Sequence, residues 1–174
     1  NTKFLRKHAT GMSDAGVQII GLPNARNYNM NNAGALWKGE NQYDFTAVDD
    51  MVYETLEGAP TAMLMLMLDA DPPWWWQRKY ASQMALDENG KQEPAKPGVS
   101  YASEKWRTDA GNFFKAYLEH VMAQPYTGHI MSVKIAAGST FEWQYYRQTL
   151  DTCADFSQPA KDGFKKWLKE KYVT

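Results

Sequence analysis

The chain has 174 residues, of which 44% are apolar, and its formal net charge is −1. This length suits one domain of ordinary size, and the near-neutral charge argues against a nucleic-acid footprint, which needs a basic stripe. The longest strongly apolar run, residues 62–68, is far too short to cross a bilayer. The single cysteine, Cys153, excludes an intrachain disulfide. Residues 1–10 lack the apolar segment of a signal peptide. A secreted protein whose signal peptide has been removed also lacks it, so the cellular compartment stays unknown.

The first predicted strand is a short β-branched run at residues 17–20, closed by Gly21. A polar stretch follows at residues 22–42, and its length and its Asn and Gly content predict a functional loop. A helix then begins near residues 43–46, where Asp44 or Thr46 can cap it, and Gly58 ends it.

The second predicted strand is the run at residues 62–68, which lacks polar alternation and therefore suits a strand buried on both faces. A helical segment is the alternative, but the prolines on either side favour a strand. Residues 87–99 form a loop that contains a tight turn at residues 87–90.

Ser103 is a good N-cap for a long helix that ends near Gln124. A third strand follows at residues 129–137, and Ser157 caps a last helix that ends near Tyr172. Strands that alternate with helices predict an α/β fold of parallel strands with right-handed crossovers, here about three strands and three helices in one domain, 1–174. Such a sheet leaves two bare edges, so we expect self-association or further strands to cover them.

Acidic and aromatic side chains follow two of the predicted strands. Asp69, Asp71, Trp74 and Trp75 come after the second strand, and Glu142 and Trp143 come after the third. In parallel α/β folds ligands bind at these strand ends, and a carboxylate beside indole rings is typical of a carbohydrate site. The alternatives are that the two aspartates cap turns before Pro72 and that Glu142 is a solvated loop residue.

The three consecutive tryptophans at 74–76 cannot all point one way on an extended segment. We therefore expect at least one of them in the core and one in the cleft. No metal spacing of His, Cys or carboxylates and no glycine-rich phosphate loop occurs, so neither a metal nor a cofactor is expected.

Several motifs resemble those of barrel glycosidases in their order and spacing. Tyr43-Asp44-Phe45-x-x-Val48-Asp49 is similar to their G-x-Y-D-F-x-x-L-D pattern after the second strand, and Asp71-Pro-Pro-Trp74-Trp75 resembles the end of their third strand. The similarity continues through residues 100–110, Glu142-Trp143, Asp155-Phe-Ser157 and Phe164-x-x-Trp167-Leu168-x-x-Lys171-Tyr172. The chain thus resembles glycoside hydrolase family forty-two, the bacterial beta-galactosidase type, from residue 43 onward.

This resemblance implies the second to fourth βα units of a (β/α)8 TIM barrel that hydrolyses glycosides with retention. Glu142 then matches the acid/base, Asp69, Asp71, Trp74, Trp75 and Trp143 are candidate contacts to sugar, and no residue matches the nucleophile after the seventh strand. Phe141 departs from the asparagine that the family usually has before its acid/base. The competing interpretations are a carbohydrate-binding module without turnover and an inactive fragment of a barrel.

Overall fold

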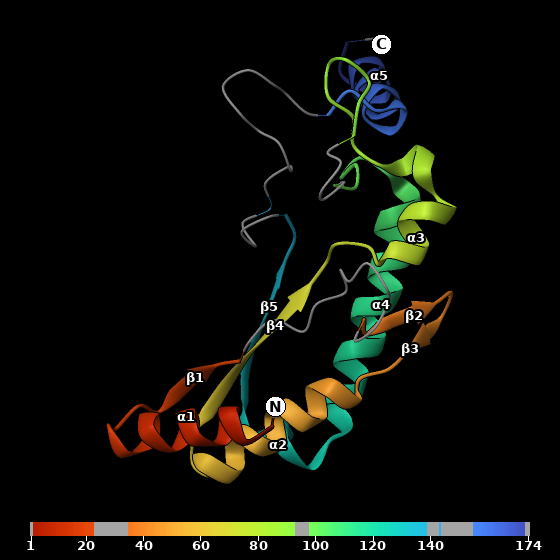
Figure 1. Ribbon diagram of the computed structural model, residues 1–174. Helices are drawn as coiled ribbons and strands as arrows, with labels where there is room; N and C mark the ends of the chain where they lie inside the picture. Colours follow the sequence, from red (N-terminus) through yellow and green to blue (C-terminus); the bar gives the residue numbers. More distant parts are fainter. Residues whose placement is uncertain (1, 23–34, 93–97, 139–142, 144–154, 173–174) are drawn as a thin grey trace.

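The computed structural model describes residues 2–22, 35–92, 98–138, 143 and 155–172 (Figure 1). Glu142 and Cys153 lie outside these residues. In the described part of the chain no helix has the length and apolarity needed to cross a membrane.

The main sheet has three parallel strands in the order β1-β4-β5, as the alternation of elements predicts. Gly21 of β1 pairs with Met65 of β4, and Asp69 of β4 pairs with Ala136 of β5. The strands are β1 (Ile19–Gly21), β4 (Met63–Asp69) and β5 (Ile130–Ala136). The run at residues 62–68 is therefore a strand and not a helix.

In the part of the chain that the structure describes, helices cover one face of this sheet and leave the other face open (Figure 1). Leu64, Leu66 and Leu68 are fully buried against α2 and α4, because alternate side chains of a strand point to opposite faces. Met63, Met65 and Met67 point to the open face and are only half-buried. The helices are α1 (Thr2–Asp14), α2 (Thr46–Gly58), α3 (Trp74–Lys79), α4 (Glu104–Ala123) and α5 (Gln158–Tyr172).

Local signals fix several element boundaries. The Ser103 hydroxyl accepts a hydrogen bond from the Trp106 backbone N–H at 3.1 Å, so the predicted cap of α4 is confirmed. The Asp87 carboxylate accepts bonds from the backbone N–H groups of Asn89 and Lys91, which forms the predicted turn with Gly90 at a φ of 73°.

The polar stretch at residues 22–42 contains regular structure that the sequence did not indicate. Its second part, with residue 43, forms a hairpin of β2 (Trp37–Gly39) and β3 (Gln42–Tyr43). Trp37 is buried because its ring stacks on Phe113 of α4, with ring centroids 5.4 Å apart. The hairpin is held by this long-range contact, which polarity along the chain does not reveal.

The tryptophan segment is a helix and not an extended strand end, which corrects the prediction. Pro73 precedes the helix with an extended ψ of 161°, and its carbonyl accepts bonds from the N–H groups of Trp76 and Gln77. A proline at this point costs no helical hydrogen bond, because the first N–H groups of a helix have no partner inside it. The prolines thus begin a helix here.

Two further elements differ from the predictions. The first strand begins at Ile19 and not at residue 17, and helix α1 precedes it where no element was predicted. The predicted α5 is present, but Phe164 and Trp167 on its apolar side are 59% and 46% exposed, so the described residues leave that side largely uncovered.

Candidate active site

Strands β4 and β5 end side by side at one edge of the sheet. The Ala70 N–H donates to the Ala136 carbonyl at 2.8 Å, which continues the ladder one residue past β4. Residues that follow either strand therefore lie at the same edge, as parallel pairing requires.

Asp69 and Asp71 are both buried at this edge, with 3% and 4% of their surface exposed. One oxygen of Asp69 accepts the Asp71 backbone N–H at 2.9 Å, which is the turn-capping geometry that was the alternative to sugar binding. The Asp71 carboxylate reaches across to the next strand end and accepts the Gly138 N–H at 3.2 Å. Both carboxylates thus hold backbone in place, and their contact with sugar stays a prediction.

Trp143 lies over the end of β5. Its backbone N–H donates to the Ala137 carbonyl at 3.0 Å, and its indole N–H donates to the Ile135 carbonyl at 3.2 Å. Its φ of 58° is in the left-handed region, which is unusual for a bulky side chain. These contacts hold Trp143 against the end of β5.

The ring of Trp143 also contacts two aromatic rings, one just before α4 and one in its first turn. Its centroid is 5.8 Å from Tyr101 and 6.5 Å from Trp106, and the rings meet edge to face. The indole N–H of Trp106 donates to the Ala70 carbonyl, which fixes these rings to the end of β4. Trp143 remains 47% exposed, so this strand end carries an accessible indole on an aromatic base.

The other tryptophans have different partners. Trp76 is fully buried, and its indole N–H donates to Asp109 of α4 at 2.7 Å, so the expectation that one of the three lies in the core is confirmed. Trp75 donates to the Trp37 carbonyl in the hairpin at 2.9 Å, and half-buried Trp74 lies under the Arg78 guanidinium. Hence the described contacts bring Asp71 and Trp143 together and direct Trp75 toward the hairpin.

Glu142, the candidate acid/base, lies outside the described residues, and so does Phe141 before it. Gly138 and Trp143, on either side of residues 139–142, are described, and both are hydrogen-bonded at the strand ends.

Tyr101 and Trp106 belong to this strand end too, although the sequence did not indicate them as site residues. The motif at residues 100–110 was the only signal for them.

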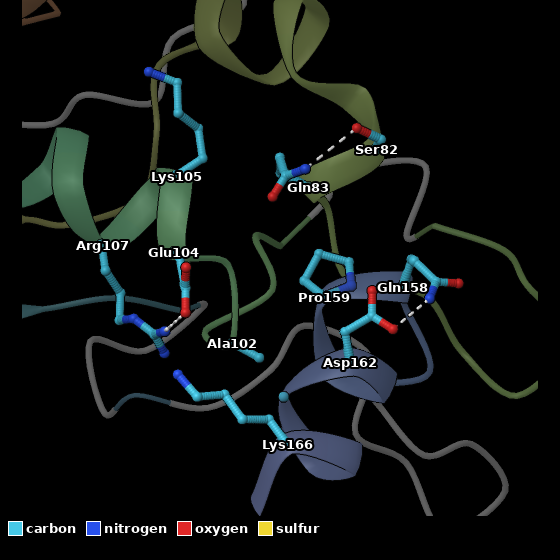
Figure 2. Close-up of a pocket in the computed structure, with 11 residues that line it drawn as sticks. Ser82, Gln83, Ala102, Glu104, Lys105, Arg107, Gln158, Pro159, Asp162 and Lys166 are labelled. Atoms are coloured by element: carbon cyan, nitrogen blue, oxygen red, sulfur yellow. Dashed lines mark hydrogen bonds and ion pairs between the residues drawn. The ribbon is translucent and has the colours of Figure 1, made fainter.

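A cavity of about 610 Å³ lies elsewhere, between the start of α4 and α5 (Figure 2). Its lining side chains are mostly charged or amide groups, and they are paired within single helices, as in Arg107 with Glu104 and Gln158 with Asp162. Among the described residues no aromatic ring lines it, so they offer no stacking surface for a sugar there.

Within the described residues no group of three or more His, Cys, Asp and Glu side chains is placed to hold a metal ion. The chemistry at the strand ends rests on carboxylates, backbone N–H groups and indole rings. This donor set suits neutral ligands that carry many hydroxyl groups.

Comparison with known sequences decides the family. The sequence profile of the glycoside hydrolase family forty-two, described as Beta-galactosidase, matches residues 38–174. The chain belongs to this family. The match covers all of the hairpin except Trp37, and it includes the two strand ends and α5.

A known member of the family is much longer than this chain. It is 27% identical over 168 residues to "Beta-galactosidase LacZ" of Heyndrickxia coagulans, a match that covers 94% of this chain and 22% of that protein. The chain thus spans about a fifth of the curated relative's length.

Solved structures show the same fold. A polyextremophilic beta-galactosidase from the Antarctic haloarchaeon Halorubrum lacusprofundi superposes with a TM-score of 0.72 at 16% identity, over 99% of this chain and 23% of that chain. A beta-galactosidase from the psychrophilic Marinomonas ef1 superposes with a TM-score of 0.70 at 18% identity, over 98% and 24%. The α/β arrangement is therefore a partial barrel of this type, and the fold class expected from the sequence is confirmed.

Proposed function

We propose that the longer protein that contains this chain hydrolyses β-galactosides with retention and that Glu142 is its acid/base. The family assignment and the beta-galactosidases among its relatives support the reaction class. We place the chain as one domain that contributes the second to fourth βα units of the barrel.

The observation that carries the proposal for Glu142 is the position of its neighbour. Trp143 follows Glu142 directly, and its backbone and indole N–H groups are bonded to carbonyls at the end of β5. Ligands of closed parallel barrels bind at this end of the strands. A glutamate beside indole rings is partly desolvated, which raises the pKa of a carboxyl and favours the acid role.

Retention needs a second carboxyl group about 5–5.5 Å from the first, which attacks the sugar. We propose that this nucleophile comes from a later strand outside the 174 residues. Asp69, Asp71, Trp74, Trp75 and Trp143 remain the candidate sugar contacts, of which Trp143 has the best support because its exposed ring lies at the strand end.

Replacement of Glu142 in the full-length protein tests its role. Glu142→Gln should lower turnover of an unactivated aryl galactoside by orders of magnitude while galactose still binds, whereas Glu170→Gln on exposed α5 should leave turnover unchanged. Near-normal turnover in Glu142→Gln removes Glu142 from the mechanism.

Azide separates the acid/base from the nucleophile. With an activated aryl galactoside, Glu142→Ala should still form the galactosyl-enzyme, and azide should attack it to give the β-galactosyl azide. The α-galactosyl azide would identify Glu142 as the nucleophile.

The open face of the sheet supports a proposal about partners. Ile19 of β1, which pairs with Met63 on this face, is 53% exposed, and β1 and β5 are the edge strands of the described sheet. We infer that the remaining barrel strands cover this face in the longer protein, and that the 174-residue piece alone self-associates. A monomer of the isolated piece in analytical ultracentrifugation would contradict the second statement.

A further inference from the structure

A cavity of about 270 Å³ lies between the β2–β3 hairpin and the first half of α4. In Figure 1 the hairpin lies on the far side of α4 from β4 and β5, so this cavity is separate from the strand ends. Like the cavity of Figure 2, it is lined by carboxylates and amides. It differs in that aromatic side chains also line it.

The walls of the cavity are fixed by contacts of their own. At the hairpin tip, Glu40 accepts hydrogen bonds from Lys79 at 2.7 Å and from the Tyr80 hydroxyl. Lys79 is the last residue of α3, and Tyr80 follows it. Trp75 donates its indole N–H to the Trp37 carbonyl. The polar edge of Trp75 is thereby engaged, and these contacts tie α3 and Tyr80 to the hairpin.

The charges of the lining are balanced. Lys105 pairs with Asp109 at 2.8 Å, four residues on in α4, and Glu40 pairs with Lys79. A ligand with a net charge would have to displace one of these pairs. The lining therefore favours a neutral ligand.

Three neutral polar groups face the cavity without a hydrogen-bond partner among the described residues: the side-chain amides of Asn41 and Asn112 and the hydroxyl of Tyr43. Burial, together with the charge of Asp109, raises the pKa of Tyr43, so its hydroxyl stays protonated and can donate. Donors and acceptors in this arrangement complement the hydroxyl groups of a sugar.

The size of the cavity limits the ligand. Sites for small molecules usually have about 300–1,000 Å³. At about 270 Å³ this cavity lies just below that range, which fits a single sugar ring and not an oligosaccharide. An indole such as Trp75 offers apolar surface for the C–H face of such a ring.

We propose that the cavity between the β2–β3 hairpin and α4 binds one neutral sugar residue, apart from the strand-end site. The ligand stacks on Trp75 and exchanges hydrogen bonds with Asn41, Asn112 and Tyr43. Of the candidate sugar contacts that follow the strands, this site uses Trp75 alone, so it does not depend on the role proposed for Glu142.

The test uses the full-length protein labelled with 5-fluorotryptophan, with D-galactose as the probe. The ¹⁹F signal of Trp75 is assigned from its loss in Trp75→Phe. We expect a saturable shift of this signal as galactose is added. Asn112→Leu should weaken the binding that it reports by about tenfold, which corresponds to one lost hydrogen bond. Asn112 is exposed, so the substitution spares the core.

Two controls make the result specific. Glu119→Gln, also exposed on α4, should leave the Trp75 shift unchanged, and Glu142→Gln should leave it unchanged even where turnover is lost. Asn112→Leu should in turn leave aryl galactoside turnover unchanged. A Trp75 signal that does not move, or that moves equally with glycerol, overturns the proposal.

Discussion

The carboxylate of Asp71 accepts the backbone N–H of Gly138 at 3.2 Å, across the ends of two neighbouring strands. Asp71 follows β4 and Gly138 follows β5, so 67 residues of sequence separate the two partners. The bond fixes the start of the segment that carries Glu142, and Gly138 has a φ of 88° at that point. A buried carboxylate thus holds the backbone at Gly138.

Removal of this carboxylate should destabilise the fold. Asp71→Ala leaves the Gly138 N–H buried without its acceptor and should lower the free energy of unfolding by about 1–3 kcal/mol. Asp71→Asn keeps one acceptor oxygen and should lose less. Urea unfolding followed by tryptophan fluorescence measures both, and equal values for the two variants and the wild type would contradict this role.

A second, half-buried acid lies at the opposite end of the sheet. Asp49 of α2 accepts the Tyr126 hydroxyl at 2.5 Å, and His120 Nε2 of α4 lies 2.8 Å from the same oxygen. Asp49→Asn should lower the free energy of unfolding by about 1–3 kcal/mol, because it weakens the links from α2 to α4 and to the turn before β5.

Asp50→Asn is the matched control for Asp49→Asn. Asp50 is adjacent in the first turns of α2 but exposed, so both substitutions remove one negative charge from the same helix end. Urea midpoints of the two variants should differ clearly. Similar losses would mean that the helix dipole and not the contact with Tyr126 is responsible.

Tyr126 predicts how stability depends on alkaline pH. Burial, followed by its bond to Asp49, raises the pKa of Tyr126 far above its ordinary value in the folded protein. In the unfolded chain Tyr126 loses its proton near pH 10, at about the ordinary pKa of tyrosine. Above that pH the unfolded state binds fewer protons, so the contribution of Tyr126 to stability falls as the pH rises.

Tyr126→Phe should therefore be less stable than the wild type at neutral pH but should lose stability less steeply above about pH 10. Urea midpoints between neutral and alkaline pH measure both effects. Tyr117, whose pKa is also raised by burial, remains in both proteins and supplies the same background. Parallel slopes would show that Tyr126 ionises equally in the folded and unfolded states.

Two glycines should respond oppositely to alanine. A Cβ at Gly58, the last residue of α2, would lie 2.3 Å from the Arg6 carbonyl oxygen of α1, so Gly58→Ala should force the two helices apart. A Cβ at Gly111 inside α4 meets no atom within 4 Å. Gly111→Ala should raise the free energy of unfolding by roughly 0.5–1 kcal/mol through helix propensity.

Thermal unfolding of both glycine variants measures this contrast. A higher melting temperature for Gly111→Ala and a lower one for Gly58→Ala are expected. A neutral Gly58→Ala would show that α1 does not pack closely on α2.

The sequence by itself determined the alternation of strands and helices, because hydrophobic periodicity and end signals are local. The uninterrupted apolar run of β4, the Ser103 cap and the turn at Asp87 were all predictable from neighbouring residues. The order of the motifs also indicated the family, since each motif keeps its spacing within the chain.

Only the tertiary structure decided which polar side chains meet. Asp71 bonds to the Gly138 N–H and Trp75 bonds to the Trp37 carbonyl, and neither partner is predictable from the neighbouring residues. The hairpin is likewise held by Phe113, about 75 residues further along. Contacts between distant segments depend on how the chain folds back on itself, and residue types along one segment do not contain that information.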